Sequence, residues 1–285
     1  MPTQKVAQPQ SKPLDVLAMG GGVQTTTILM MAYHGELPKP DHIIFADLGW
    51  EKPAVYEHLE WLQKIAKISR IPFHVIHTGD IRNDAIRSNL YQTSPDAPRW
   101  AQMPLFSLDV AGNHGQLRRQ CTLHYKIRPI DRYIKQNLLG LQPRQHAPQG
   151  SVRLWFGISA DEPNRVHASD LAWKIYHYPL VDEDQGRDDC HYWLDRNGYH
   201  HPARSSCLGC PYRSNAEWHW LRANDPNAYA DVVHWDRQIR HPDKIAATLY
   251  VHRDRLPLAQ ADLAPKRKKT TPPLRLTECW GYCDT

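Results

Sequence analysis

Residues 14–27 read LDVLAMGGGVQTTT, an apolar run that passes directly into three glycines and three threonines. Leu14 to Met19 is short and apolar enough for a buried strand, and Ile28 to Tyr33 has the composition of a helix. Glycines between a strand and a helix let the backbone approach a phosphate, and the free N–H groups of the helix start hold its charge. The turn lacks the GKS/T of a Walker A loop and the spacing of GxGxxG.

Further alternation follows this unit. We expect strands at Asp41–Ala46 and Pro72–His77, with a helix between them that starts near Pro53. Strand, helix and strand joined by short links predict an α/β fold with a doubly wound parallel sheet. Further along, we expect an irregular excursion over 81–120, a helix over 127–141, strands at 152–158 and 176–181, and helices over 188–197, 216–221 and 228–240.

Composition bounds the class of protein. The chain has 285 residues, 41% hydrophobic residues and a net charge of +5. Mean hydropathy is −0.63, and no apolar run reaches the roughly 18 residues that span a bilayer. The first fifteen residues contain no apolar signal-peptide core, so we expect a cytoplasmic protein with no membrane partner. We expect a flexible leader (1–13), an α/β nucleotide-binding domain (14–185) and a helical, Cys-rich C-terminal region packed on it (186–285).

Six cysteines without a secretion signal argue against a disulfide framework. Cys207 and Cys210 form a CxxC motif, and Cys279 and Cys283 form a CxxxC motif. Clustered thiols in a reducing compartment indicate metal, iron–sulfur or redox chemistry.

The glycine-rich turn resembles the SGGxDS-type PP-loop of the ATP pyrophosphatase and PAPS reductase superfamily (the adenine nucleotide alpha hydrolase-like fold). Gly20 stands where that pattern has Ser, Gln24 where it has an acidic residue, and Thr25 where it has Ser. The resemblance implies that this turn binds ATP with Mg²⁺ through Gly20, Gly21, Gly22, Gln24, Thr25 and Thr26.

Two further segments match the same superfamily. Residues 45–51, FADLGWE, resemble its second-strand segment, which implies that Asp47 lies at the nucleotide and takes part in catalysis; an ordinary helix cap is the alternative. Residues 156–165 resemble its Gly-Ile/Leu-Arg segment, which implies nucleotide contacts from Gly157, Ser159 and Arg165. Ser159 stands where an Arg is frequent.

The cysteine order also resembles that of the iron–sulfur members. Cys121, in the segment 118–130, and the distant Cys207 and Cys210 correspond to cluster ligands, with Thr122 in place of a second Cys. The resemblance implies a [4Fe-4S] cluster, with zinc or plain buried or redox thiols as alternatives. The fourth ligand is Cys190, Cys279, Cys283 or a non-protein group. Basic residues around Cys121 would offset the charge of a cluster or of a bound anion, and a solvated basic face is the alternative: Arg118, Arg119 and Lys126.

The C-terminal segment 278–283, ECWGYC, resembles the mobile Glu-Cys-Gly tail of sulfonucleotide reductases. That resemblance implies a catalytic role for Cys279, and for Cys283 as its partner, in attacking sulfur or carrying it as a persulfide. A cluster ligand and a structural pair are equal alternatives.

Three functions remain open. The first is an ATP-dependent sulfurtransferase that adenylates an acceptor, either a nucleic-acid base or phosphate or a small molecule. The second is an APS or PAPS reductase acting through Cys279, and the third is a non-catalytic module that binds a nucleotide or DNA. Besides the adenine nucleotide, the partners compatible with these functions are nucleic acid, a cysteine desulfurase or thiol reductant, and a second copy in a homodimer.

Overall fold

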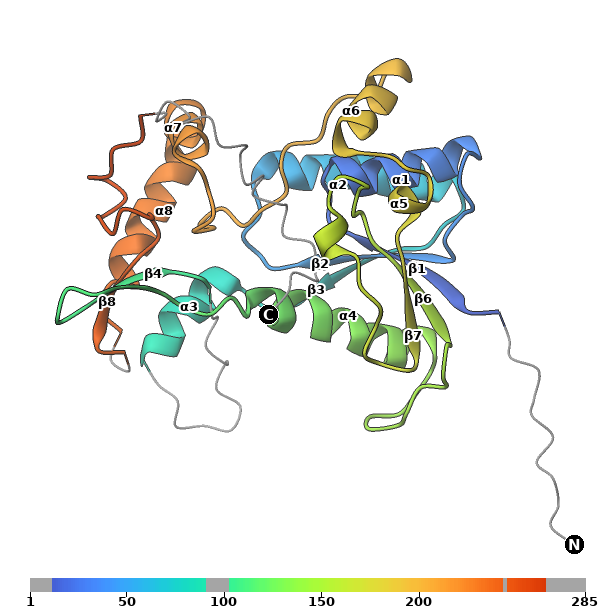
Figure 1. The fold of residues 1–285 in the computed structure, drawn as a ribbon, viewed down its shortest axis with the longest axis horizontal. Helices are drawn as coiled ribbons and strands as arrows, with labels where there is room; N and C mark the ends of the chain where they lie inside the picture. Colours follow the sequence, from blue (N-terminus) through green and yellow to red (C-terminus); the bar gives the residue numbers. More distant parts are fainter. Residues whose placement is uncertain (1–11, 91–102, 243–244, 265–285) are drawn as a thin grey trace, which may run out of the picture.

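The computed structural model describes residues 12–90, 103–242 and 245–264. Its centre is a five-stranded sheet with the order β3-β2-β1-β6-β7, and every neighbouring pair is parallel (Figure 1). The predicted α/β fold with a parallel sheet is therefore confirmed. The strands are β1 (Leu14–Met19), β2 (His42–Asp47), β3 (Phe73–His77), β6 (Val152–Trp155) and β7 (Lys174–His177).

Both faces of the sheet are buried. Along β1, Leu17 and Met19 point into one apolar cluster, while Val16 and Ala18 point into another on the opposite face. This is the period-two alternation of a strand. It explains why the central strands read as uninterrupted apolar runs, as expected of a parallel sheet covered on both sides.

Helices cover the two faces. On the first face lie α1 (Val23–His34) and α2 (Pro53–Ile68), with α6 (Arg187–Arg196) packed over α1 (Figure 1). The second face is covered by a continuous helical segment over 123–138. Its ends are π-helical and its middle α-helical: η1 (Leu123–Ile127), α4 (Arg128–Tyr133) and η2 (Ile134–Leu138). None of the helices in the described part of the chain is long and apolar enough to cross a membrane.

The strand expected over 176–181 is wrong in its second half. Strand β7 ends at His177, and Pro179 begins a short helix, α5 (Pro179–Asp182). Proline has no N–H to give to a sheet, whereas its fixed φ suits the first position of a helix.

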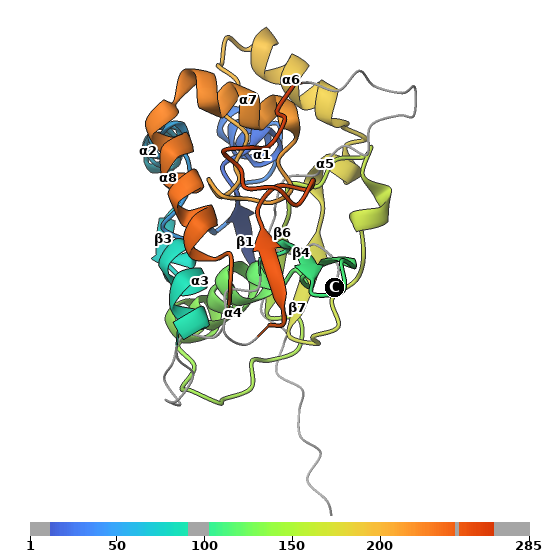
Figure 2. The same cartoon turned by 90° about the vertical axis from the view of Figure 1, so that its left-hand side faces the viewer.

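A second, antiparallel sheet lies beside the first and was not expected. It has the order β5-β4-β8, and it packs with α7 (Asn215–Asn224) and α8 (Pro226–Gln238) around Trp218 and Trp235 (Figure 2). The excursion expected over 81–120 therefore contains regular structure where it is described. The remaining elements are α3 (Ile81–Leu90), β4 (Phe106–Asp109), β5 (His114–Gln116), η3 (Pro163–Arg165) and β8 (Ala247–Tyr250).

Candidate nucleotide and thiol site

The glycine-rich turn joins β1 to α1 at the carboxyl edge of the parallel sheet. Gly21 adopts φ +77°, a conformation that side chains disfavour, and Gly22 is the N-cap of α1 without a side-chain cap. The first turn of α1 also lacks an acidic residue, and its residues are buried. An uncapped, buried helix N-terminus carries free N–H groups and a partial positive charge, which suit a phosphate.

Two polar atoms at this N-terminus have no partner. The Thr25 hydroxyl and the Gln24 side-chain carbonyl oxygen are buried and make no hydrogen bond. Native structures leave few such atoms unpaired. Together with the uncapped helix, these atoms fit an ATP phosphate group and the donors or acceptors that accompany it.

The segment after β6 is packed directly against this turn. A β-carbon at Gly157 would lie 2.6 Å from Thr25 Cγ2 and 3.0 Å from Thr25 N, so only glycine fits there. Gln24 Nε2 donates to Ser159 Oγ and to Glu162 Oε2, both at 2.7 Å. Glu162 in turn pairs with Arg165 at 2.9 Å. The structure thus brings together Gln24 and the segment 157–165, as the sequence predicted.

The two departures from the PP-loop pattern are bonded to each other. Gln24 stands at the usual acidic position and Ser159 at a position where Arg is frequent, and their side chains share the 2.7 Å hydrogen bond. A neutral amide and a hydroxyl therefore meet where the pattern has charged groups. The negative charge lies one side chain further on, at Glu162.

Asp47 ends β2 at the same edge of the sheet. One of its oxygens, Oδ1, accepts hydrogen bonds from Gly49 N at 2.9 Å and from Tyr56 Oη at 3.0 Å. The other, Oδ2, lies 3.2 Å from His77 Nδ1. These contacts fix the turn between β2 and α2, so Asp47 has a structural role besides the one proposed for it at the nucleotide.

Thr26 faces away from the segment 157–165. Its hydroxyl lies 2.9 Å from His58 Nε2, and His58 Nδ1 lies 3.2 Å from His200 Nε2. Burial lowers the pKa of His58 to about 4. A buried neutral imidazole therefore links the first turn of α1 to an exposed histidine. The sequence gave no signal for His58, because its partners are 32 and 142 residues away.

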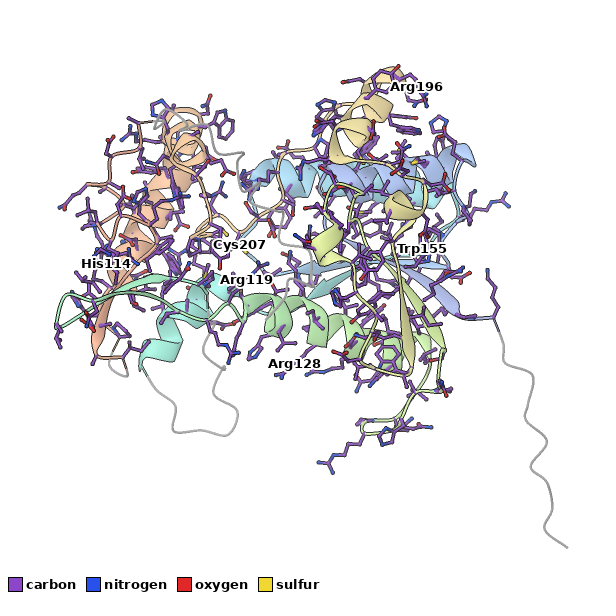
Figure 3. All side chains as sticks on the ribbon, in the orientation of Figure 1. His114, Arg119, Arg128, Trp155, Arg196 and Cys207 are labelled. Atoms are coloured by element: carbon purple, nitrogen blue, oxygen red, sulfur yellow. The ribbon has the colours of Figure 1, made fainter. Side chains whose placement is uncertain are left out.

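The two segments that carry the predicted thiol ligands meet. Arg119 lies over the Tyr212 ring at 5.6 Å, which brings the segment before Cys121 to the loop of Cys207 and Cys210 (Figure 3). All three thiols belong to, or pack against, one apolar cluster. Arg213 holds the CxxC loop, since its guanidinium donates to the carbonyls of Leu208 and Cys207 at 3.1 Å each.

The donor chemistry of these thiols fits an iron–sulfur cluster or zinc. Three cysteines lie on two segments in contact, and Arg213 places a buried cation where it acts on the Cys207 and Cys210 thiols. The described residues nevertheless contain no group of three His, Cys, Asp or Glu side chains arranged to hold a metal ion. Cys279 and Cys283 lie outside the described residues.

Cys190 is separated from the other thiols. It lies in the apolar cluster between α1 and α6, and its carbonyl oxygen lies 3.5 Å from the Thr27 hydroxyl. Burial raises the pKa of its thiol to about 12, which keeps it protonated. This placement contradicts Cys190 as the fourth ligand, because the sequence motif could not show that α6 packs against α1.

No protein-family model matches the chain, and no curated protein matches its sequence. Among solved structures, it is similar to "U34-tRNA thiolase NcsA from Methanococcus maripaludis with its [4Fe-4S] cluster". The two chains are 13% identical, the TM-score is 0.39, and the match covers 81% of this chain and 74% of that one. This is a distant likeness.

Proposed function

We propose that the chain is an ATP-dependent sulfurtransferase. The observation that carries this proposal is the N-terminus of α1: buried, uncapped, and provided with a Thr25 hydroxyl that has no partner. An oxygen of the acceptor would attack the α-phosphorus of ATP and release pyrophosphate. Sulfur would then displace AMP from the adenylated acceptor.

The chain's own residues divide this work. The turn at Gly20–Gly22 and the first turn of α1 bind and orient the phosphates, with Mg²⁺ accompanying the nucleotide. Gly157 and the Gln24–Ser159 hydrogen bond hold that turn in place. The loop of Cys207 and Cys210, together with Cys121, carries the thiols.

The resemblance implies that these thiols hold a [4Fe-4S] cluster, with zinc as the alternative. A bound cluster would supply a site for inorganic sulfide. The protein contributes the buried cation Arg213, which stabilises negative charge on Cys207 and Cys210. A nucleic-acid acceptor and a cysteine desulfurase or thiol reductant as sulfur or electron source belong to the same proposal.

Calorimetric titration with ATP tests the nucleotide part. Thr25→Val is isosteric and removes the unpartnered hydroxyl, so ATP affinity should fall by about tenfold for one lost hydrogen bond to a charged group. Thr27→Val is the matched control, because its hydroxyl already donates to Val23 O at 2.9 Å. Equal ATP affinity in wild type and in Thr25→Val would contradict a phosphate at this site.

Product assays separate this function from sulfonucleotide reduction. The anaerobically purified protein is incubated separately with ATP, APS and PAPS, with total tRNA or DNA as acceptor. We expect pyrophosphate only with ATP and an acceptor. Sulfite released from APS or PAPS, and lost in Cys279→Ser, would instead establish the reductase.

A further inference from the structure

Glu51 is the most unusual buried group in the described part of the chain. It lies between β2 and α2, its side chain is buried, and neither carboxylate oxygen makes a hydrogen bond. A buried polar group without a partner costs on the order of 1–3 kcal/mol, and more when it is charged. Proteins keep such groups chiefly where a function needs them. The cost therefore indicates a partner that is not part of this chain.

The surroundings of Glu51 place it between the two halves of the candidate site. Lys126, five residues after Cys121, and Arg213, three residues after Cys210, both act on its charge, and so does Asp47 at the sheet edge. No cation forms a hydrogen bond with the Glu51 carboxyl, and Arg213 is bonded instead to backbone carbonyls. The carboxyl thus stands between the end of β2 and both thiol-bearing segments.

We propose that Glu51 binds the sulfur acceptor, and that this acceptor is a lactam: a ring carbonyl with an N–H beside it, as in a nucleobase. The inference rests on the proposed sulfur transfer, because it assigns the acceptor of that same reaction. A protonated carboxyl with two unpartnered oxygens offers a donor and an acceptor side by side. A lactam offers the complementary pair, so both oxygens gain a partner.

A backbone phosphate does not complete this pairing. A phosphodiester has acceptor oxygens but no donor, so one Glu51 oxygen would stay buried without a partner. Burial raises the pKa of Glu51, which favours the protonated form that a lactam needs. Of the two nucleic-acid acceptors that the sequence left open, base and phosphate, Glu51 therefore selects the base.

Ligand-observed NMR on the full chain tests the pairing with uridine and 3-methyluridine, which lacks the lactam N–H. We expect wild type to bind uridine at least tenfold more tightly. Glu51→Gln should keep this preference, since an amide also offers a donor and an acceptor, while Glu51→Leu should lose it. Equal binding of the two nucleosides by wild type, or a preference retained in Glu51→Leu, would overturn the proposal.

Thermal unfolding separates binding from a structural role. Glu51→Leu should melt at the same temperature as wild type or higher, because it removes an unpaired buried polar group. A melting temperature lowered by more than about 5 °C, well above the effect expected from 1 kcal/mol in a chain this long, would show that Glu51 stabilises the fold and would refute the proposal. Glu57→Gln, an exposed carboxyl on α2, is the control and should change neither readout.

ATP titration of the same variants distinguishes the two proposals. Glu51→Gln and Glu51→Leu should bind ATP as wild type does, because the phosphate site lies at α1. If wild type fails to bind ATP, the proposed function fails, while the uridine comparison still decides whether Glu51 recognises a lactam.

Discussion

Gly209 lies against the indole ring of Trp50, so closely that a β-carbon on Gly209 would overlap the six-membered ring. The same loop is anchored by a hydrogen bond from Leu208 N to Trp50 O at 2.8 Å. Trp50 is itself fixed, since its Nε1 donates to Asp231 at 3.1 Å. The middle of the CxxC motif is therefore seated on the residue next to Glu51, and the position of both thiols depends on this contact.

Gly209→Ala should therefore displace the CxxC loop. Overpacking of this kind costs about 1–3 kcal/mol of unfolding free energy, because the ring and the backbone must both shift. Urea denaturation measures the loss. Trp50→Leu removes the obstructing ring, so the double variant Gly209→Ala/Trp50→Leu should lose less than the sum of the two single changes. Additive losses would show that the contact does not limit residue 209.

Gly157→Ala should weaken ATP binding by about tenfold or more. The added methyl group would meet Thr25 Cγ2 at 2.6 Å and Thr25 N at 3.0 Å, so the first turn of α1 would have to move. Calorimetry with ATP measures the effect. Adding Thr25→Ser removes the closer contact but not the one to the backbone, so it should restore part of the affinity. Unchanged affinity in Gly157→Ala would place the nucleotide elsewhere.

The stability of the protein should fall between pH 6.5 and pH 4. Burial holds the pKa of His58 at about 4, below its value of 6.5 in an unfolded chain, so the unfolded state binds the extra proton first. The contribution of His58 is complete above pH 6.5, and about 2 kcal/mol of it is lost by pH 5.

Urea denaturation at pH 7 and pH 5 checks this dependence. His58→Gln should flatten it, because no group titrates at that position any longer. His219→Gln, an exposed histidine on α7, should leave it as in wild type. A pH dependence that is the same in His58→Gln and in wild type would be inconsistent with the buried neutral imidazole.

Iron content should distinguish the four described cysteines. After anaerobic purification, Cys121→Ala, Cys207→Ala and Cys210→Ala should each lose most of the bound iron and sulfide and should melt lower, since cluster binding is linked to folding. Cys190→Ala should keep the full iron load, because Cys190 lies in the cluster between α1 and α6. A full iron load in the first three variants would rule them out as ligands, and zinc in place of iron would support the alternative metal.

The sequence predicted the parts of the fold that are local. Strand β1 was expected at Leu14–Met19 and is found there, because an apolar run that ends in glycines has few alternatives. Strand β8 was missed, since its partner β4 lies more than 130 residues earlier in the chain and neither strand is long. Short strands in a peripheral sheet carry little periodicity, so their pairing becomes visible only in three dimensions.

The candidate site shows the same limit. Glycine-rich turns and CxxC motifs are contiguous, so Gly20–Gly22 and Cys207–Cys210 could be identified from the sequence alone. Glu51 and His58 owe their properties to burial against distant residues, and no spacing records burial. Cys190 was assigned from residue type, and the structure places it in another core.

The apolar cluster that surrounds the CxxC loop contains no residue of β1 or β6. The central sheet and the peripheral sheet are therefore held by largely separate sets of side chains. Amide hydrogens in β1, buried on both faces, should exchange with solvent only through global unfolding, whereas those of β8 should exchange through smaller openings of its own cluster. A chain built this way can loosen around its thiols, to admit a large acceptor, while the strands that precede the glycine-rich turn stay closed.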